Sequence, residues 1–231
     1  MKQQKLLTLV LALAPVTALA HTSSPGALRL GVSETHVGMA GASANMPGAT
    51  LAVGGRYRGV WVRAGLSFAR GAGASLEVLN VRATANPTAA LSPYLAAGLI
   101  DLTSLDGATS TTDYQVNAGG LITPTTTTTN RPLRGAVMGY GFVGLRARVD
   151  LNPRWQIAAH AAIGAGFGGS VTGLPATSQG GSPFATDLGM VIRYRVTGHA
   201  TAALTYTREV IPVRGATFRS EAVELSMVRT F

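Results

Sequence analysis

The residues most able to support chemistry stand close together near the start of the chain, at Ser33-Glu34-Thr35-His36. A serine, a histidine and a carboxylate are the groups that nucleophilic acyl transfer uses. If this segment is a β-strand, successive side chains alternate between its two faces, so Glu34 and His36 share one face and Ser33 takes the other. The three groups then do not meet, and we expect no catalytic role for them.

A glycine-rich run, Gly164-Ala-Gly-Phe-Gly-Gly169, is a second candidate, because small residues let a backbone approach a phosphate group closely. A phosphate loop also needs a lysine and a following helix. The run contains no lysine, and it continues an alternating apolar pattern that begins at Trp155. We therefore interpret it as a stretch of small residues in a curved strand.

The elements that would position such groups are predicted by apolar residues at every second position. The pattern is clear over residues 28–33, 51–58, 60–68, 137–149, 155–167, 188–196, 202–207 and 223–227, and weaker over 75–82 and 94–102. Hydrophobic residues make up 46% of the chain and charged residues 13%. After residue 20, however, no apolar run is long enough for a transmembrane helix. An apolar chain with a period of two is typical of a transmembrane β-barrel.

The fold class that we predict is all-β, a closed antiparallel transmembrane β-barrel of about ten strands. Eight strands is the alternative, if the weakly patterned segments at 75–82 and 94–102 do not form a membrane hairpin. Turn-forming residues mark short joints at 58–59, 150–154 and 196–199.

Longer joints are expected at residues 37–48, 103–134 and 169–185, which are rich in Gly, Ser, Thr and Pro or in Ala and Met. The run Thr125–Thr129 is expected to form a disordered loop. Short turns that alternate with longer joints predict short periplasmic turns and longer extracellular loops.

The N-terminus has the three parts of a secretory signal peptide. Lys2 and Lys5 form a basic start, Leu6–Leu19 is an apolar run, and Ala18-Leu19-Ala20 fits the small-residue cleavage rule. We predict a signal peptide over residues 1–20 and a single barrel domain over residues 21–231.

The charge of the chain is basic, with 19 Lys and Arg against 10 Asp and Glu. The arginines are scattered singly and do not cluster, so nucleic acid is not expected as a partner. The chain has no cysteine, which excludes disulfides and thiolate metal sites. Asp101, Asp106 and Asp113 lack the spacing of a calcium-binding loop. We therefore expect no metal and no cofactor.

The C-terminal strand resembles that of bacterial outer-membrane β-barrels, which usually end in Phe with apolar residues at alternate positions before it. Val223, Leu225, Met227 and Phe231 match this pattern, and Arg229 departs from it. The resemblance implies that the barrel-assembly machinery reads this strand. It also implies a place in the bacterial outer membrane, with outer-membrane lipid as a partner.

The stretch Gly144–Trp155 is similar to a strand–turn–strand of small barrels related to outer-membrane protein A. In those barrels the turn places an aromatic residue at the periplasmic interface, which Trp155 would occupy here. The resemblance names no surface partner.

Eight arginines fall on the predicted inner face. They are Arg29, Arg56, Arg58, Arg63, Arg146, Arg148, Arg193 and Arg195. One interpretation is a lumen that attracts anions. The other, which we favour, is a small lumen filled by arginine–carboxylate pairs, with Glu77, Asp150 and Glu224 as the partners. Such a lumen would conduct little or nothing.

The function that we expect is non-enzymatic, with an envelope-structural, surface-interaction or narrow-pore role. The alternative is an outer-membrane enzyme, either a lipid A or phospholipid hydrolase or an omptin-like protease. Such a protease needs an Asp–His pair at the barrel mouth. Asp187 is near a predicted loop, but His160 is in mid-strand and His199 is in a tight turn. The sequence therefore predicts no catalytic residue.

Overall fold

The computed structural model describes residues 26–39, 41–71, 73–105, 108–116, 122–130, 134–172, 184–213 and 216–231. The predicted signal peptide and its cleavage site lie outside these ranges and stay predictions. No helix in the described part of the chain is long and apolar enough to cross a membrane.

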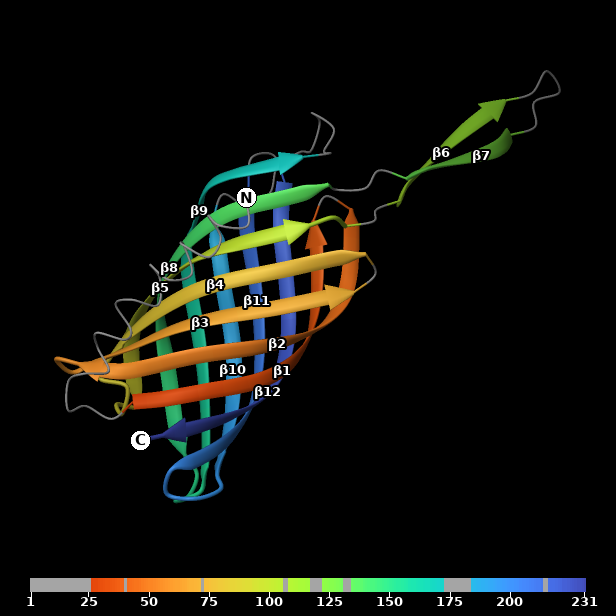
Figure 1. Ribbon diagram of the computed structural model, residues 1–231. Coiled ribbons are helices and arrows are strands. Elements are labelled where there is room, and N and C mark those ends of the chain that lie inside the picture. Colours follow the sequence, from red (N-terminus) through yellow and green to blue (C-terminus); the bar gives the residue numbers. More distant parts are fainter. Residues whose placement is uncertain are drawn as a thin grey trace, which may run out of the picture.

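Ten strands form a closed antiparallel barrel (Figure 1). Their bounds are β1 Gly26–Met39, β2 Ala42–Tyr57, β3 Val60–Gly71, β4 Ala74–Ala85, β5 Leu91–Thr103, β8 Gly135–Asp150, β9 Trp155–Thr172, β10 Ala185–Arg195, β11 Ala200–Val213 and β12 Ala216–Thr230. Each strand pairs with its neighbour in the chain, except that β5 pairs with β8. The predicted barrel of ten strands is confirmed.

The barrel closes where β12 pairs with β1, from Ala27 opposite Thr230 to Met39 opposite Phe218. Two backbone hydrogen bonds join Gly26 and Phe231 beyond this ladder, at 3.0 and 3.1 Å. A closed ladder leaves no unpaired strand edge, which is the condition for a sheet to cross a bilayer.

The alternative of eight strands is wrong, because β4 and β5 are full members of the barrel. The apolar alternation of β4 is weak because Leu76 and Val78 point inward whereas Leu79 and Val81 lie on the outer face. Both faces of this strand are therefore apolar over part of its length.

The two ends of the barrel differ, and we name them by their connections. The turn end carries the Gly26 and Phe231 ends of the barrel and four short connections, at residues 58–59, 86–90, 151–154 and 196–199. The loop end carries the other five connections. In outer-membrane barrels the end with short turns faces the periplasm.

Three of the connections at the loop end are only two residues long, at residues 40–41, 72–73 and 214–215. The expected long joint at residues 37–48 is therefore wrong, since almost all of it belongs to β1 and β2. Gly41 and Gly73 adopt positive φ angles of 84° and 78° in these tight turns, a conformation that favours glycine.

The two long connections lie between β5 and β8 and between β9 and β10. The first contains a hairpin of its own, formed by β6 (Ala108–Val116) and β7 (Ile122–Asn130). This hairpin projects away from the loop end of the barrel (Figure 1). The Thr125–Thr129 run lies in β7, so the expected disordered loop is corrected to a strand.

The glycine-rich run is part of β9, as predicted. A side chain at Gly164 would collide with the Gly141 carbonyl oxygen, and one at Gly166 with that of Pro212. An irregularity in the β8–β9 ladder follows at Val137–Gly139. The run therefore lets neighbouring strands approach closely. The long joint expected at residues 169–185 begins later than predicted, because β9 continues to Thr172.

Candidate functional site

The exterior of the barrel has two zones. Around its middle and its turn end, the outward positions form a belt of exposed apolar side chains. The belt includes Leu30, Val32, Leu51, Leu95, Val143, Leu145, Ile163, Leu188, Leu204, Val223, Leu225 and Met227. Nearer the loop end the outward positions of β1, β2 and β12 become polar, as at Glu34, His36, Asn45, Arg219 and Glu221, whereas β8 and β9 keep Val137 and Phe167 exposed.

The interior changes in the opposite sense. Near the loop end it is filled by fully buried apolar side chains, which we call the apolar plug. The plug includes Val37, Met39, Met46, Ile100, Leu102, Met138, Ile211 and Phe218, each at most 2% exposed. In the lipid-facing zone, the inward positions are mostly polar or charged.

Strand length explains this reversal. β2 and β8 each have 16 residues and β9 has 18, whereas a tilted strand needs only about 9 to 11 residues to cross a bilayer. The strands therefore extend past the apolar belt at the loop end. There the barrel has an apolar core and, on β1, β2 and β12, a polar exterior, as a water-soluble protein does.

The middle of the lumen contains a cluster of charged and aromatic side chains centred on the fully buried Asp187. Arg82 donates to Asp187 Oδ2 at 2.8 Å, and the Tyr94 hydroxyl donates to the same oxygen at 2.9 Å. His160 Nε2 lies 3.0 Å from Oδ1. The Arg82 guanidinium also lies 4.5 Å from the centre of the Tyr94 ring. Both oxygens of the carboxylate are therefore occupied.

A second ion pair lies on the opposite wall of the lumen. Arg29 donates through Nε to Glu224 Oε1 at 2.8 Å and through Nη2 to Thr205 Oγ1 at 2.9 Å. These residues belong to β1, β12 and β11, so the pair joins the strands at which the barrel closes. A buried pair with both partners hydrogen-bonded is costly to break, because removal of one member leaves an unpaired charge.

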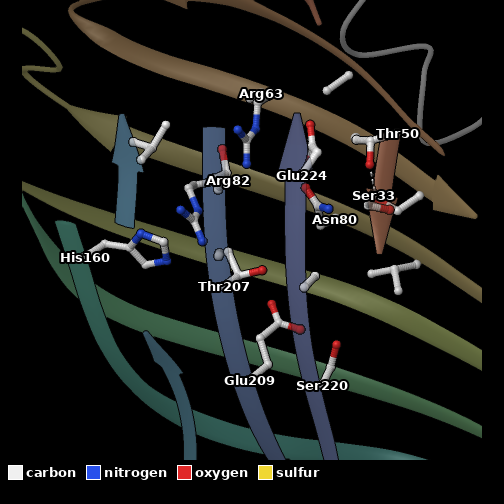
Figure 2. A pocket seen from close by; sticks show the side chains of 18 of the residues that line it. Ser33, Thr50, Arg63, Asn80, Arg82, His160, Thr207, Glu209, Ser220 and Glu224 are labelled. Carbon is white, nitrogen blue, oxygen red and sulfur yellow. Dashed lines mark hydrogen bonds between the residues drawn. The ribbon is translucent and has the colours of Figure 1, made fainter. Parts of the chain in front are cut away.

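Two cavities lie below the apolar plug. The central cavity, of about 180 Å³, has His160, Arg82, Arg63, Glu209 and Glu224 in its lining (Figure 2). The turn-end cavity, of about 400 Å³, lies nearer the short turns. Five arginines line both cavities and so form a layer between them. They are Arg29, Arg63, Arg82, Arg146 and Arg193.

The sequence-predicted lumen residues divide into two groups. Arg29, Arg63, Arg146, Arg148 and Arg193 line the turn-end cavity, and Glu224 lines the central one. Arg56, Arg58 and Arg195 are exposed beside the turns and are absent from the described lining of both cavities. Arg58 has a positive φ of 48° and lies over the Tyr57 ring, so its expected place on the inner face is wrong.

The expected carboxylate partners also divide. Glu224 pairs with Arg29, and Asp150 pairs with Arg148 at 2.7 Å beside a turn. Glu77 lies opposite Phe68 and Asp101 in the ladder, on the outer face, and so cannot pair with a lumen arginine. The expectation for Glu77 is wrong because it followed from spacing in the most weakly patterned strand.

The Asp187 cluster was not predicted from the sequence. Its signal is the alternation of β10, which puts Asp187 on the same face as Gly189 and Arg193. Arg82 lies two positions after Asn80 in β4, so the two side chains share one face of the strand. The mixed apolar pattern of β4 does not indicate whether that face points inward. His160 lies within β9, as its predicted mid-strand position requires, whereas Asp187, expected near a loop, lies within β10.

The candidate hydrolase residues are separated by the wall of the barrel. Ser33 faces the central cavity, whereas Glu34 and His36 are exposed on the outer face. His36 Nδ1 lies 2.7 Å from Asn45 Oδ1 on the neighbouring strand. Among the described residues, no group of three His, Cys, Asp or Glu side chains could hold a metal ion.

The last strand has the arrangement that the C-terminal pattern predicts. Val223, Leu225, Met227 and Phe231 are all exposed on the outer face, and Arg229 shares that face. Trp155 is also exposed next to a turn and lies 4.8 Å from Tyr194, ring centre to ring centre. Aromatic residues at this level are typical of the membrane–water interface.

The closed ladder, the apolar belt and the aromatic residues near the turns define the class of protein. The chain is a transmembrane β-barrel of the outer-membrane type, and its place is the bacterial outer membrane.

Comparison with solved structures finds barrels of the same class at low similarity. Outer membrane protease OmpT from Escherichia coli shares 9% identity at a TM-score of 0.48, over 91% of this chain and 98% of its own. Neisserial surface protein A shares 11% identity at 0.43, over 89% and 97%. The NanC porin shares 13% identity at 0.34, over 85% and 98%.

These likenesses assign no activity. A scan with protein-family models finds no match, and neither does a search of curated proteins.

Proposed function

We propose that this barrel is a non-enzymatic, non-conducting protein of the outer membrane with an envelope-structural role, which displays the β6–β7 hairpin at its outer end. The observation that carries this proposal is the apolar plug. A pore needs a continuous polar path, whereas Phe218, Ile100 and Leu102 are completely buried inside the loop end. The Asp187 and Glu224 ion pairs further constrict the lumen.

Planar bilayer recording tests this proposal directly. Purified, refolded barrel should give no stable conductance steps at either polarity. Double substitution of plug residues, Phe218→Ala with Met138→Ala, should raise leak currents because it opens space in the plug. Large, regular steps from the unmodified protein would contradict the proposal and favour a diffusion pore.

The enzyme alternative has one supporting observation, the His160–Asp187 pair. Its geometry favours a structural role, because Asp187 also binds Arg82 and Tyr94 and because the pair lies inside the lumen. The His160 and Asp187 side chains are only 8% and 1% exposed. We therefore expect no hydrolysis of lipid or peptide substrates by the purified protein. Hydrolysis that is abolished by His160→Ala or His36→Ala would reverse this assignment.

The proposal includes recognition of the last strand by the barrel-assembly machinery. Support comes from the exposed Phe231 side chain and from the strand's position at the β12–β1 closure. Deletion of Phe231 should reduce the amount of heat-modifiable barrel in outer-membrane fractions, whereas Phe231→Tyr should retain most of it. Equal amounts from the deletion and the parent would refute this role.

A further inference from the structure

The turn-end cavity has an unusual charge. Six arginines line it, and its described lining contains no aspartate or glutamate. The arginines are Arg29, Arg63, Arg82, Arg146, Arg148 and Arg193. Trp61, Thr84 and Gln156 are among the other residues of its wall, and Pro87, Thr88 and Thr230 lie toward the turns. The cavity is therefore a cationic chamber on the side of the plug that faces the periplasm.

Three of the six arginines have a carboxylate partner. Arg29 pairs with Glu224, Arg82 with Asp187, and Arg148 with Asp150. These pairs neutralise half of the positive charge around the cavity.

The other three arginines are bound only by neutral groups or by none, as far as the described residues show. Arg193 donates to the Gln156 side-chain oxygen at 2.6 Å, and Arg146 donates to the Pro87 carbonyl oxygen at 3.2 Å. For Arg63, the described residues include no carboxylate partner. The chamber therefore has three arginines that form no ion pair with the described carboxylates.

Arg63 provides an independent observation. Its Nε atom is buried and has no hydrogen-bond partner in the structure. A guanidinium N–H donor that is removed from water without a partner is costly, and the cost is larger for a charged group. Arg63 itself lines both cavities, so a molecule bound in either cavity would lie beside its charge.

The arginines around the cavity also act on one another. Burial disfavours the charge of both Arg63 and Arg193. Arg193 is also repelled by Arg146, Arg29 and Arg148. Arg63 is repelled by Arg29, Arg82 and Arg193, and among the described residues only Glu224 attracts it. Like charges inside a confined, low-dielectric space repel one another more strongly than they do in water. An anion between them would reduce this repulsion, because its charge attracts each of the arginines.

We infer that the turn-end cavity is a binding site for a small soluble oxyanion, a phosphate or diphosphate group, held by Arg63, Arg146 and Arg193. Arginine presents its donors in a planar fork that matches such oxyanions. The source is soluble and not a lipid headgroup, because the closed ladder separates this cavity from the bilayer. The site opens toward the periplasm, and the plug prevents passage to the other side.

Calorimetric titration of inorganic pyrophosphate into the refolded full-length barrel tests this inference, with ionic strength held constant by sodium chloride. Saturable binding is expected, together with a higher unfolding temperature when the anion is present. Arg63→Gln and Arg193→Gln should each weaken binding by about tenfold or more, since each removes a charged donor. Absence of binding to the parent protein would overturn the inference.

Arg208→Gln is the matched control. Arg208 lies on the outer face near the loop end, with its side chain 52% exposed. Its substitution by Gln removes the same charge from the protein as the cavity substitutions do. Binding should stay at the parent level in this variant. An equal loss of binding in Arg208→Gln would mean that the anion responds only to net charge, and the assigned site would be wrong.

A variant that adds a carboxylate makes the test independent of folding defects. Thr201 lines the cavity and lies two positions from Ala203, the ladder partner of Arg193. A glutamate there reaches diagonally across the ladder. Thr201→Glu should stabilise the ligand-free barrel and weaken pyrophosphate binding, because the new carboxylate takes the place of the anion. Unchanged affinity in a folded Thr201→Glu barrel would contradict the site.

Discussion

The loop end and the lipid-facing zone of this barrel are filled by side chains of opposite polarity. At the loop end the lumen is filled by Phe218, Ile100 and Leu102, and the exterior of β1, β2 and β12 is polar. In the lipid-facing zone, the lumen contains arginine–carboxylate pairs and the exterior is apolar. The comparison shows that the surroundings of each zone, water or lipid, set the polarity of its exterior. Because successive side chains of a strand point to opposite faces, the residues between these outward positions point into the lumen.

Among the substitutions that test the contrast between these two zones, Asp187→Ala is expected to lower the free energy of unfolding most. Arg82, Tyr94 and His160 all contact the Asp187 carboxylate, so its removal leaves a buried cation without a partner. We expect the free energy of unfolding in lipid vesicles to fall by about 3 to 5 kcal/mol. Glu221→Ala, on the outer face, is the control and should change little. If Asp187→Ala lowers the free energy of unfolding by less than Glu221→Ala does, the Asp187 cluster does not stabilise the barrel.

A somewhat smaller effect is expected from Leu102→Ala, which creates a cavity in the apolar plug. Leu102 is completely buried, and the cost of such a truncation is about 2 to 4 kcal/mol. Leu99→Ala on the same strand faces outward and is 45% exposed, so it should cost less. Urea unfolding of both variants compares the two faces of β5. Equal losses would mean that the plug is not packed as a core.

Glu224→Gln should have an intermediate effect. It keeps the shape of the side chain but removes the charge that Arg29 binds at 2.8 Å. The expected loss of unfolding free energy is about 1.5 to 3 kcal/mol, the range for a hydrogen bond to a charged group. Because the pair joins the closing strands, the unheated protein should also convert to its boiled mobility at a lower temperature. An unchanged conversion temperature would exclude a role in closure.

The smallest effect on stability is expected on the outer face of the barrel. Arg208 and Glu221 form an ion pair at 3.3 Å with side chains 52% and 46% exposed. An exposed pair contributes about 0.2 to 1 kcal/mol and is screened by salt. A double-mutant cycle with Arg208→Gln and Glu221→Gln should therefore give a small coupling energy that vanishes at high salt. A coupling as large as the Glu224→Gln effect would contradict the contrast between lumen and exterior.

Alternation alone was sufficient to predict most of the lipid-facing zone. Arg29, Arg63, Arg146 and Arg193 each stand between apolar residues that face lipid, so the inward direction of each could be read from its neighbours. The closed ladder followed from the same pattern, because strands with an apolar exterior lie in lipid, where the backbone groups of an open edge would have no hydrogen-bond partner.

The loop end could not be predicted in this way because the alternation changes sign there. Over residues 37–48 the small and apolar residues, such as Val37 and Met46, point inward, while Ser43 and Asn45 point outward. A rule that expects apolar residues to face lipid finds no strand in such a segment. The Asp187 cluster was hidden for another reason, since its members come from β4, β5, β9 and β10 and only the register brings them together.

The uneven connections at the loop end also have a consequence for how the sequence can change. Where β1 meets β2, β3 meets β4 and β11 meets β12, only two residues separate paired strands, so an inserted residue would disturb the ladder directly. The connections between β5 and β8 and between β9 and β10 leave the ladder free of that restraint. Insertions, epitope tags and natural variation should therefore accumulate on one flank of the outer rim, while the opposite flank keeps a fixed outline.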